Sequence, residues 1–150
     1  DRSLKYLWSE AFPDRINQVE THPFYQQTAA KKYMNKYGVQ IEAWAPFGEG
    51  RGGLFENETL QEIGNQYGKT TAQVMLRWNI QRGVVVIPKS THYERMKENI
   101  DVFDFALTES DMEKISTLDK AESSFFSHYD PAIVEWFVKM VEERKEKNRK

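Results

Sequence analysis

The sequence contains no cysteine, only three histidines and little excess of charge of either sign. Without cysteine there is no disulfide framework, thiolate metal site or thiol nucleophile, and such a composition fits a reducing cytoplasm. Three histidines are too few for a histidine-rich metal centre, so we predict no metal. Lys and Arg total 21 against 23 Asp and Glu, a net charge of −2, which gives no support for binding of nucleic acid.

Long hydrophobic runs are also missing. No apolar run approaches the roughly 18 residues of a membrane span, and the charged start at Asp1 and Arg2 does not resemble a secretory signal. Hydrophobic residues nevertheless make up 39% of the 150 residues, enough for the packed core of one domain. We therefore predict one cytoplasmic domain over residues 1–150 with no membrane association, whose last nine, polar residues fray.

Short β-rich segments alternate with longer amphipathic ones, which predicts an α/β fold. Strands are predicted at 16–20, 39–44 and 84–87. Helices are predicted at 4–12, 26–37, 57–67, 71–82, 95–99 and 108–118, and from residue 131 onward. The run 84–87 has no polar alternation, which is typical of a parallel strand buried on both faces. A closed (β/α)8 barrel needs about 250 residues, or 200 at the short end, so three such strands form only part of a larger architecture.

Chemistry in parallel α/β folds lies at the carboxyl ends of the strands. The third predicted strand is followed by Lys89 and Ser90, and the next helix carries Arg95. Two cations beside the free N–H groups of a helix N-terminus favour an anion, phosphate in particular. The alternative is a solvated loop lysine with a surface arginine, and the residues alone do not decide between the two.

The other strand ends carry weaker signals. Trp44 can stack on a planar ligand, although an ordinary aromatic plug is the simpler interpretation. The glycine-rich stretch from Gly48 to Gly53 can bring N–H groups to a phosphate, but it lacks the spacing of the known phosphate-binding loops. His22 follows Glu20 by two residues, and a structural His-Pro turn explains it better than a metal site.

The strand-end motifs together resemble the aldo-keto reductase family, its bacterial members in particular. INQVETHPFYQ is similar to the family's sixth strand and the loop after it, and EAWAPFGEG is similar to its seventh strand. VVVIPKSTHYERMKENIDVFDFALTESDMEKISTLD is similar to its eighth strand, cofactor loop and following helices. The resemblance, which extends over about residues 4 to 130, implies a partial (β/α)8 TIM barrel: roughly strands 6 to 8 with their helices and a C-terminal helix.

The resemblance implies an oxidoreductase that reduces small aldehydes or ketones to alcohols with NADP(H). Gln18 would hydrogen-bond the nicotinamide carboxamide, and Trp44 would stack on the nicotinamide ring. Phe47, Gly48 and the loop to Gly53 would lie across the pyrophosphate.

The same resemblance assigns the adenosine end of the cofactor. Lys89, Ser90 and Arg95 would hold the 2′-phosphate, which implies a preference for NADP(H) over NAD(H). Glu98 and Asn99 would bind the adenine.

Two further segments leave alternatives open. Glu49 stands where the family often has a small hydroxyl residue, and its carboxylate is unfavourable near a pyrophosphate unless Arg51 offsets it. Phe125, Phe126 and Trp136 either line a substrate pocket or pack on the helix layer, and we favour packing.

The acid–base chemistry of the family uses a tyrosine, an aspartate, a lysine and a histidine on its first four strands. No motif of this sequence matches that tetrad, so we assign no catalytic residue and expect the 150-residue chain to be inactive alone. Alternatives are a non-catalytic half-barrel that binds NADP(H) and an assembly module. A three-stranded parallel sheet has two open edges, so we expect a homodimer or a domain-swapped form if the chain folds by itself.

Overall fold

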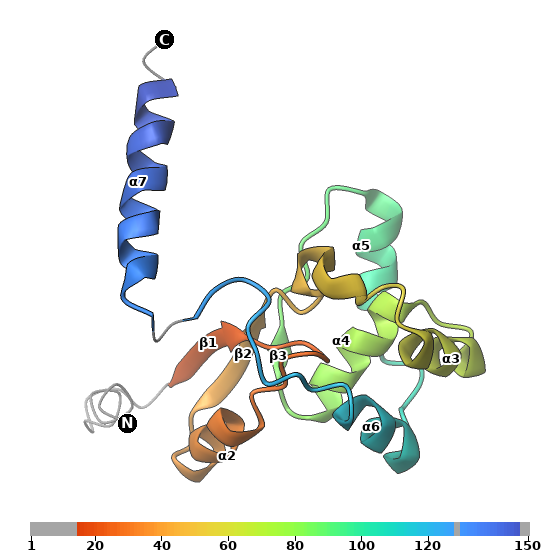
Figure 1. Cartoon of the computed structure of the whole chain (residues 1–150). Helices are drawn as coiled ribbons and strands as arrows, with labels where there is room; N and C mark the ends of the chain where they lie inside the picture. Colours follow the sequence, from red (N-terminus) through yellow and green to blue (C-terminus); the bar gives the residue numbers. More distant parts are fainter. Residues whose placement is uncertain (1–14, 128–129, 148–150) are drawn as a thin grey trace.

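The computed structural model of the chain describes residues 15–127 and 130–147 (Figure 1). The predicted helix at 4–12 lies outside the described residues. Three strands form one sheet in the order β1 (Ile16–Glu20), β2 (Gln40–Trp44) and β3 (Val85–Val86), and both neighbouring pairs are parallel. The predicted parallel α/β arrangement is therefore confirmed.

Helices lie between the strands and after the last one. They are α2 (Thr28–Lys36), the 3-10 segment η1 (Gly48–Gly53), α3 (Glu58–Tyr67), α4 (Thr71–Gln81), α5 (Tyr93–Ile100), α6 (Glu109–Ser116) and α7 (Ala132–Lys147). Capping boxes start α4 and α6, because Thr70 and Thr108 each exchange hydrogen bonds with the residue three positions on. Asp130 accepts a hydrogen bond from the Ala132 N–H at 2.9 Å, at the start of α7.

One face of the sheet packs against helices. Successive strand residues alternate between the two faces, so Ile41 and Ala43 lie on the same face of β2. Both are buried in a cluster with Met34 of α2 and Val84, which precedes β3. A second cluster, which includes Trp78, lies among α3, α4 and α6. These two clusters are the hydrophobic core of the described chain.

The opposite face of the sheet, which we call the open face, is less buried than the sequence predicts. Gln18, Glu42 and Val85 are register partners and form one row across it. Val85 is 44% exposed and Ile87 is 47% exposed, because the described part of the chain supplies no layer over them. The prediction that 84–87 is buried on both faces is therefore wrong. Burial on both faces requires a covering layer on each side, and the helices cover only one.

The helix α7 stands away from the sheet and the other helices (Figure 1). None of its described residues is buried, and Val134, Trp136 and Val138 are among its exposed apolar side chains. Helical geometry continues to Lys147, six residues into the tail that we expect to fray, and fraying in solution stays a prediction. Among the helices of the described residues, none is both long and apolar enough to cross a membrane.

Candidate functional site

A groove opens where the loop after β3 meets the first turns of α4 and α5. Its volume is about 650 Å³. It gathers six of the nine sequence-predicted site residues: Phe47, Lys89, Ser90, Arg95, Glu98 and Asn99. Residues that sequence reasoning did not assign complete it: Phe55, Thr70, Thr71, Ala72, Thr91 and His92.

The loop that enters α5 presents unpaired cations and N–H groups. Lys89 and Arg95 are exposed, and neither makes an ion pair with any residue in the described ranges. The Ser90 hydroxyl accepts a hydrogen bond from the His92 N–H at 3.1 Å, which bends the loop into the helix. His92 is the N-cap of α5, but its side chain makes no capping hydrogen bond. The N-terminus of α5 therefore offers backbone donors beside two positive charges, an arrangement that favours an oxyanion.

A polar link holds α5 beside α4 and so keeps the two groove walls together. The Lys69 ammonium group lies 2.8 Å from carboxylate oxygens of both Asp101 and Asp104. The Gln73 side chain on α4 donates to the Asp101 carbonyl at 2.8 Å. The hydrogen bonds that Lys69 donates to both aspartates raise the pKa of Lys69, and the one to Asp104 lowers the pKa of that carboxyl group. The pair of helices is therefore joined at the end of α5 opposite the cations.

Gln18 and Trp44 lie outside the groove, on the open face of the sheet. Gln18 pairs with Glu42, and Trp44 follows Glu42 by two residues, so all three side chains belong to that face. The Gln18 side-chain amide donates to the Glu42 carboxylate at 2.8 Å. The half-buried Trp44 ring packs against Phe125 with centroids 4.8 Å apart. Neither partner was anticipated from the sequence, because both contacts join segments that are distant along the chain.

Gly48 lies in a buried turn between these two regions. Its φ is +55°, and an added Cβ would lie 2.7 Å from the Leu54 Cδ1 atom. The Arg51 Nη2 atom lies 3.9 Å from a carboxylate oxygen of Glu49, and both side chains are more than half exposed, so the two charges attract only weakly. The Arg51 guanidinium also stacks 4.4 Å from the centroid of the Phe125 ring. The loop therefore depends on glycine for its conformation, and Arg51 connects it to the segment of Ser124 and Phe125.

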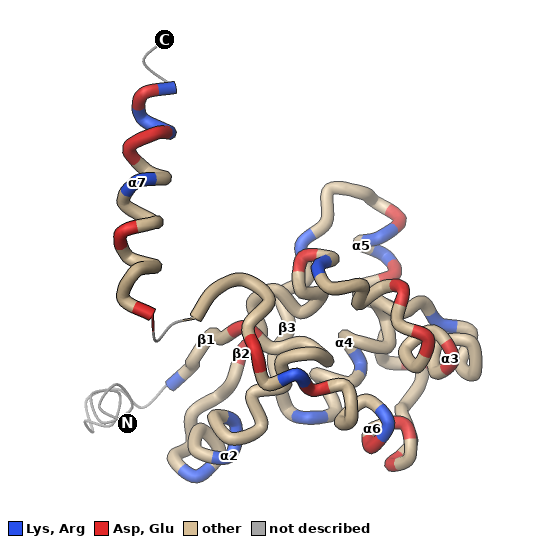
Figure 2. Tube along the Cα trace, in the orientation of Figure 1, with Lys and Arg blue, Asp and Glu red and all other residues tan. Residues whose placement is uncertain are grey.

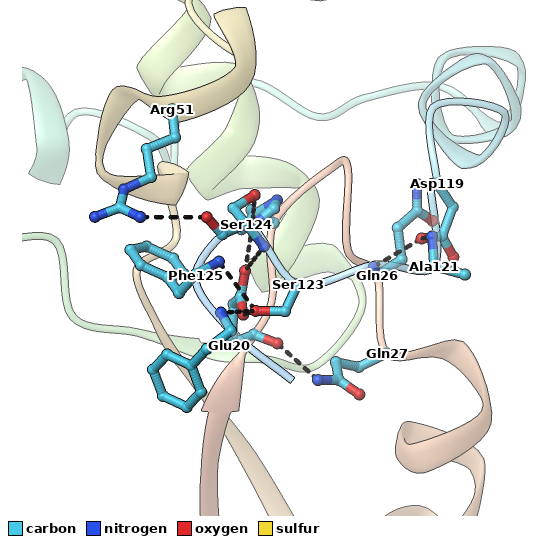
Figure 3. A network of polar contacts seen from close by, with 11 residues as sticks. Glu20, Gln26, Gln27, Arg51, Asp119, Ala121, Ser123, Ser124 and Phe125 are labelled. Carbon is cyan, nitrogen blue, oxygen red and sulfur yellow. Dashed lines mark hydrogen bonds and ion pairs between the residues drawn. The ribbon is translucent and has the colours of Figure 1, made fainter. Parts of the chain in front are cut away.

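A buried polar network ties the segment after α6 to the end of β1 (Figure 3). Glu20 and His22 are 1% and 0% exposed, and the Glu20 carboxylate lies 2.9 Å from His22 Nε2. Glu20 also accepts hydrogen bonds from the Ser123 hydroxyl at 2.5 Å and the Ser124 N–H at 2.9 Å. Burial is the main cause that lowers the pKa of His22, although the Glu20 hydrogen bond and charge oppose it. We interpret the network as structural, in line with the predicted His-Pro turn.

The network does not have the geometry of a nucleophilic triad. The Ser124 hydroxyl, at 3.3 Å, and Glu20 both meet the same ring nitrogen of His22. His22 Nδ1 is buried and has no partner in the described ranges, so no carboxylate orients the ring through its second nitrogen. In the part of the chain that the structure describes, no group of three or more His, Cys, Asp or Glu side chains is placed to hold a metal ion.

The C-terminal aromatic residues do not share one environment. Phe125 packs on Trp44 of β2, whereas the Phe126 ring meets Phe137 of α7 edge-on at 5.2 Å. Trp136 contacts the same Phe137 ring at 5.0 Å. Phe125 therefore packs on the sheet and Phe126 on α7, whereas Trp136, a residue of α7 itself, is 53% exposed and does not pack on a helix layer within the described residues.

Comparison with known proteins agrees with this architecture. The model of the Aldo/keto reductase family matches residues 9–120. Glyoxal reductase of Bacillus subtilis is 47% identical over 107 residues, which are 71% of this chain and 38% of the relative. Methylglyoxal reductase DkgA of Escherichia coli is 38% identical over 107 residues, or 39% of the relative. The chain thus spans well under half the length of these curated relatives.

Solved structures are similar over more of the chain. An aldo-keto reductase, MGS-M4, from a Medee basin deep-sea metagenome library has a TM-score of 0.80 and 39% identity, covering 87% of this chain and 48% of that one. A Gox0644 mutant in complex with NADPH has a TM-score of 0.75 and 34% identity, covering 82% and 45% of the two chains. These similarities confirm the predicted fold class, a partial (β/α)8 barrel. On its sequence and its fold, this chain belongs to the aldo/keto reductase family.

Proposed function

We propose that this chain forms the NADP(H)-binding part of an aldo-keto reductase that reduces small aldehydes or ketones to alcohols. The observation that carries the proposal is the groove in which Lys89, Ser90 and Arg95 face the same space as Glu98 and Asn99. Two cations without acidic partners in the described ranges leave a positive charge that a dianionic 2′-phosphate neutralises. The NADPH complex of a similar structure supports the same cofactor class.

Each groove residue has a defined task in the proposal. The Arg95 guanidinium offers a planar fork of donors to phosphate oxygens, whereas the Lys89 ammonium acts as a point charge. Ser90 adds a neutral hydroxyl beside them, and the uncapped N-terminus of α5 adds N–H donors. Glu98 and Asn99, one turn further along α5, supply an acceptor and an amide for the amino and ring nitrogens of adenine.

The nicotinamide end of the proposed site lies on the open face. The Gln18 amide nitrogen is engaged by Glu42, which leaves its carbonyl oxygen to accept from a carboxamide N–H group. Trp44, held by Phe125, offers an aromatic face for stacking. A bound reduced nicotinamide supplies the hydride that converts a carbonyl to an alcohol. We propose no residue of this chain as the proton donor and expect no turnover by the 150-residue chain alone.

Titration with NADPH and NADH, followed by tryptophan fluorescence, tests the proposal. We expect NADPH to bind more tightly and to quench the emission of Trp44. Lys89→Ala and Arg95→Ala remove charge-assisted hydrogen bonds to the 2′-phosphate, so each variant is expected to weaken NADPH binding about tenfold or more. NADH, which lacks that phosphate, is expected to bind both variants as it binds the parent chain.

The matched control is Lys97→Ala. Lys97 lies on the same helix as Arg95, but it is outside the groove and within 3.9 Å of Glu94. We expect this variant to bind NADPH with unchanged affinity, because an exposed cation that does not line the groove contributes little to binding. Equal affinity of the parent chain for NADH and NADPH would overturn the assigned 2′-phosphate role.

A further inference from the structure

A second pocket, separate from the groove, lies among α2, α4 and α6. Its volume is about 450 Å³, within the usual range of small-ligand sites. It shares no residue with the groove. The residues that line it are Gln26, Thr28, Lys31, Lys32, Asn35, Trp78, Arg82, Met112 and Ser116. Three of them are cations and none is an acid, and Figure 2 shows Lys or Arg but no Asp or Glu along α2.

Arg82 is held in place but only partly satisfied. Its guanidinium lies 4.0 Å from the centroid of the Trp78 ring, and its Nη2 donates to the Gln26 carbonyl. Its Nη1 is buried and has no hydrogen-bond partner in the described ranges. An unpaired buried N–H group of a charged side chain is costly, so this donor of Arg82 stays unsatisfied in the described chain.

The two lysines are equally without acidic partners. Neither Lys31 nor Lys32 makes an ion pair with any residue of the described ranges. Burial lowers the pKa of Arg82 to about 10, opposed by the charge of Asp119, and burial together with the Arg82 charge lowers the pKa of Lys31. Asp119 already accepts hydrogen bonds from the backbone N–H groups of Gln26 and Ala121. Asp119 therefore offsets only part of the positive charge of Arg82 and Lys31, and an anion in the pocket would offset more of it.

We propose that this pocket binds a phosphate group, carried by inorganic phosphate or by a small phosphate monoester. A dianion matches the excess of positive charge, and Arg82 and Lys31 give it a fork of donors and a point charge. Thr28 and Asn35 add neutral hydrogen-bonding groups to the pocket wall. The site is independent of the proposed cofactor groove and adds a second ligand to the chain.

Inorganic phosphate is the probe, and the groove cations must first be removed because they also attract phosphate. The experiment therefore uses the 150-residue chain with Lys89→Gln and Arg95→Gln, and calorimetric titration at constant ionic strength. We expect saturable binding of one phosphate per chain. Adding Lys31→Gln and Lys32→Gln is expected to weaken binding about tenfold or more, because charged hydrogen-bond partners are lost.

Controls separate the site from general charge effects. Lys36→Gln removes a cation from the same helix, outside the pocket, and is expected to leave phosphate affinity unchanged. Circular dichroism checks that each variant is folded, and phosphate is expected to raise the Tm of the Lys36→Gln variant but not of the Lys31→Gln, Lys32→Gln variant. Unchanged affinity after loss of Lys31 and Lys32, or no saturable binding at all, would overturn the proposal.

Two further ligands identify the source of the phosphate. Glycerol 3-phosphate that binds more tightly than inorganic phosphate assigns the pocket to a monoester, and the reverse order assigns it to free phosphate. Succinate matches the charge but not the tetrahedral shape. Succinate that binds as tightly as phosphate shows that the assignment to a phosphate group is wrong.

Discussion

Gly48 is a position where both conformation and space require glycine. Its φ is +55°, and a Cβ added there would lie only 2.7 Å from the Cδ1 atom of Leu54, a fully buried core residue. Gly38 has φ of +64° but no atom within 4 Å of an added Cβ. We expect Gly38→Ala to cost about 1 kcal/mol of unfolding free energy from backbone strain alone, and Gly48→Ala to cost about 1–3 kcal/mol more. Urea unfolding of the two variants measures the difference, and equal losses would contradict the packing argument.

Because His22 is buried, we expect the free energy of unfolding to decrease in mild acid. Burial holds its pKa below the ordinary value of 6.5 in the folded state. When the pH falls below about 6.5, the unfolded chain binds a proton that folded His22 does not, so the free energy of unfolding decreases. The decrease is at most about 1.4 kcal/mol per pH unit and ends at the lower, folded-state pKa. Urea unfolding between pH 7.5 and 5.5 measures it.

Two histidine variants isolate that effect. His22→Gln is expected to lose the part of the pH dependence that His22 causes. His92→Gln removes an exposed histidine and is expected to keep the parent slope. A His22→Gln variant with the same pH dependence as the parent chain would rule out His22 as its source.

At the scale of elements, the capping box of α6 also connects this helix to α3. Thr108 caps α6, and Asp111 accepts hydrogen bonds from the Thr108 N–H at 3.0 Å and the Tyr67 hydroxyl at 2.5 Å. Burial pushes the pKa of Asp111 up, but the hydrogen bonds from Tyr67 and Thr108 bring it below its ordinary value. The cap of α6 is therefore also a bond between α6 and the end of α3.

Removal of the Thr108 cap is expected to lower the free energy of unfolding. Thr108→Ala leaves the Asp111 N–H without its side-chain acceptor and is expected to destabilise the chain by about 1 kcal/mol. Ser110→Ala, an exposed change on the same helix, is expected to alter stability by less than about 0.5 kcal/mol. Thermal unfolding by circular dichroism compares them. A Thr108→Ala variant as stable as Ser110→Ala would show that the capping box contributes nothing measurable.

At the scale of the whole molecule, the described residues leave apolar surface uncovered on the open face. Ile16, Val85 and Ile87 belong to that face or its edge and are between 44% and 61% exposed. Exposed apolar side chains beside unpaired strand edges favour association. We therefore expect a homodimer or a domain-swapped form in light scattering, and Ile87→Lys is expected to shift it toward the monomer because a charge at the contact would be desolvated.

Val138→Lys is the control for association, because it also places a charge on an exposed apolar residue, but on α7. We expect it to leave the oligomer intact. A parent chain that is a monodisperse monomer would contradict association, and dissociation by Val138→Lys instead of Ile87→Lys would place the interface on α7.

Features with short-range causes were within reach of the sequence alone. The helices predicted at 57–67, 71–82 and 108–118 and the strand predicted at 39–44 depend on hydrogen bonds and periodicities that span a few residues. The motif around Lys89 and Arg95 also lies on one short loop and one helix, so its joint presence in the groove was predictable.

Only the tertiary structure decided the features that join distant segments. No local signal brings Phe55 and Thr70 to the groove, Phe125 to Trp44, or Lys31 to the same pocket as Arg82. The exposure of Val85 also depends on tertiary structure. A run of apolar residues favours burial, but it does not show which helices or strands pack over the run. Burial and side-chain contacts depend on how helices and strands pack together, and that packing is a property of the whole chain rather than of any one stretch.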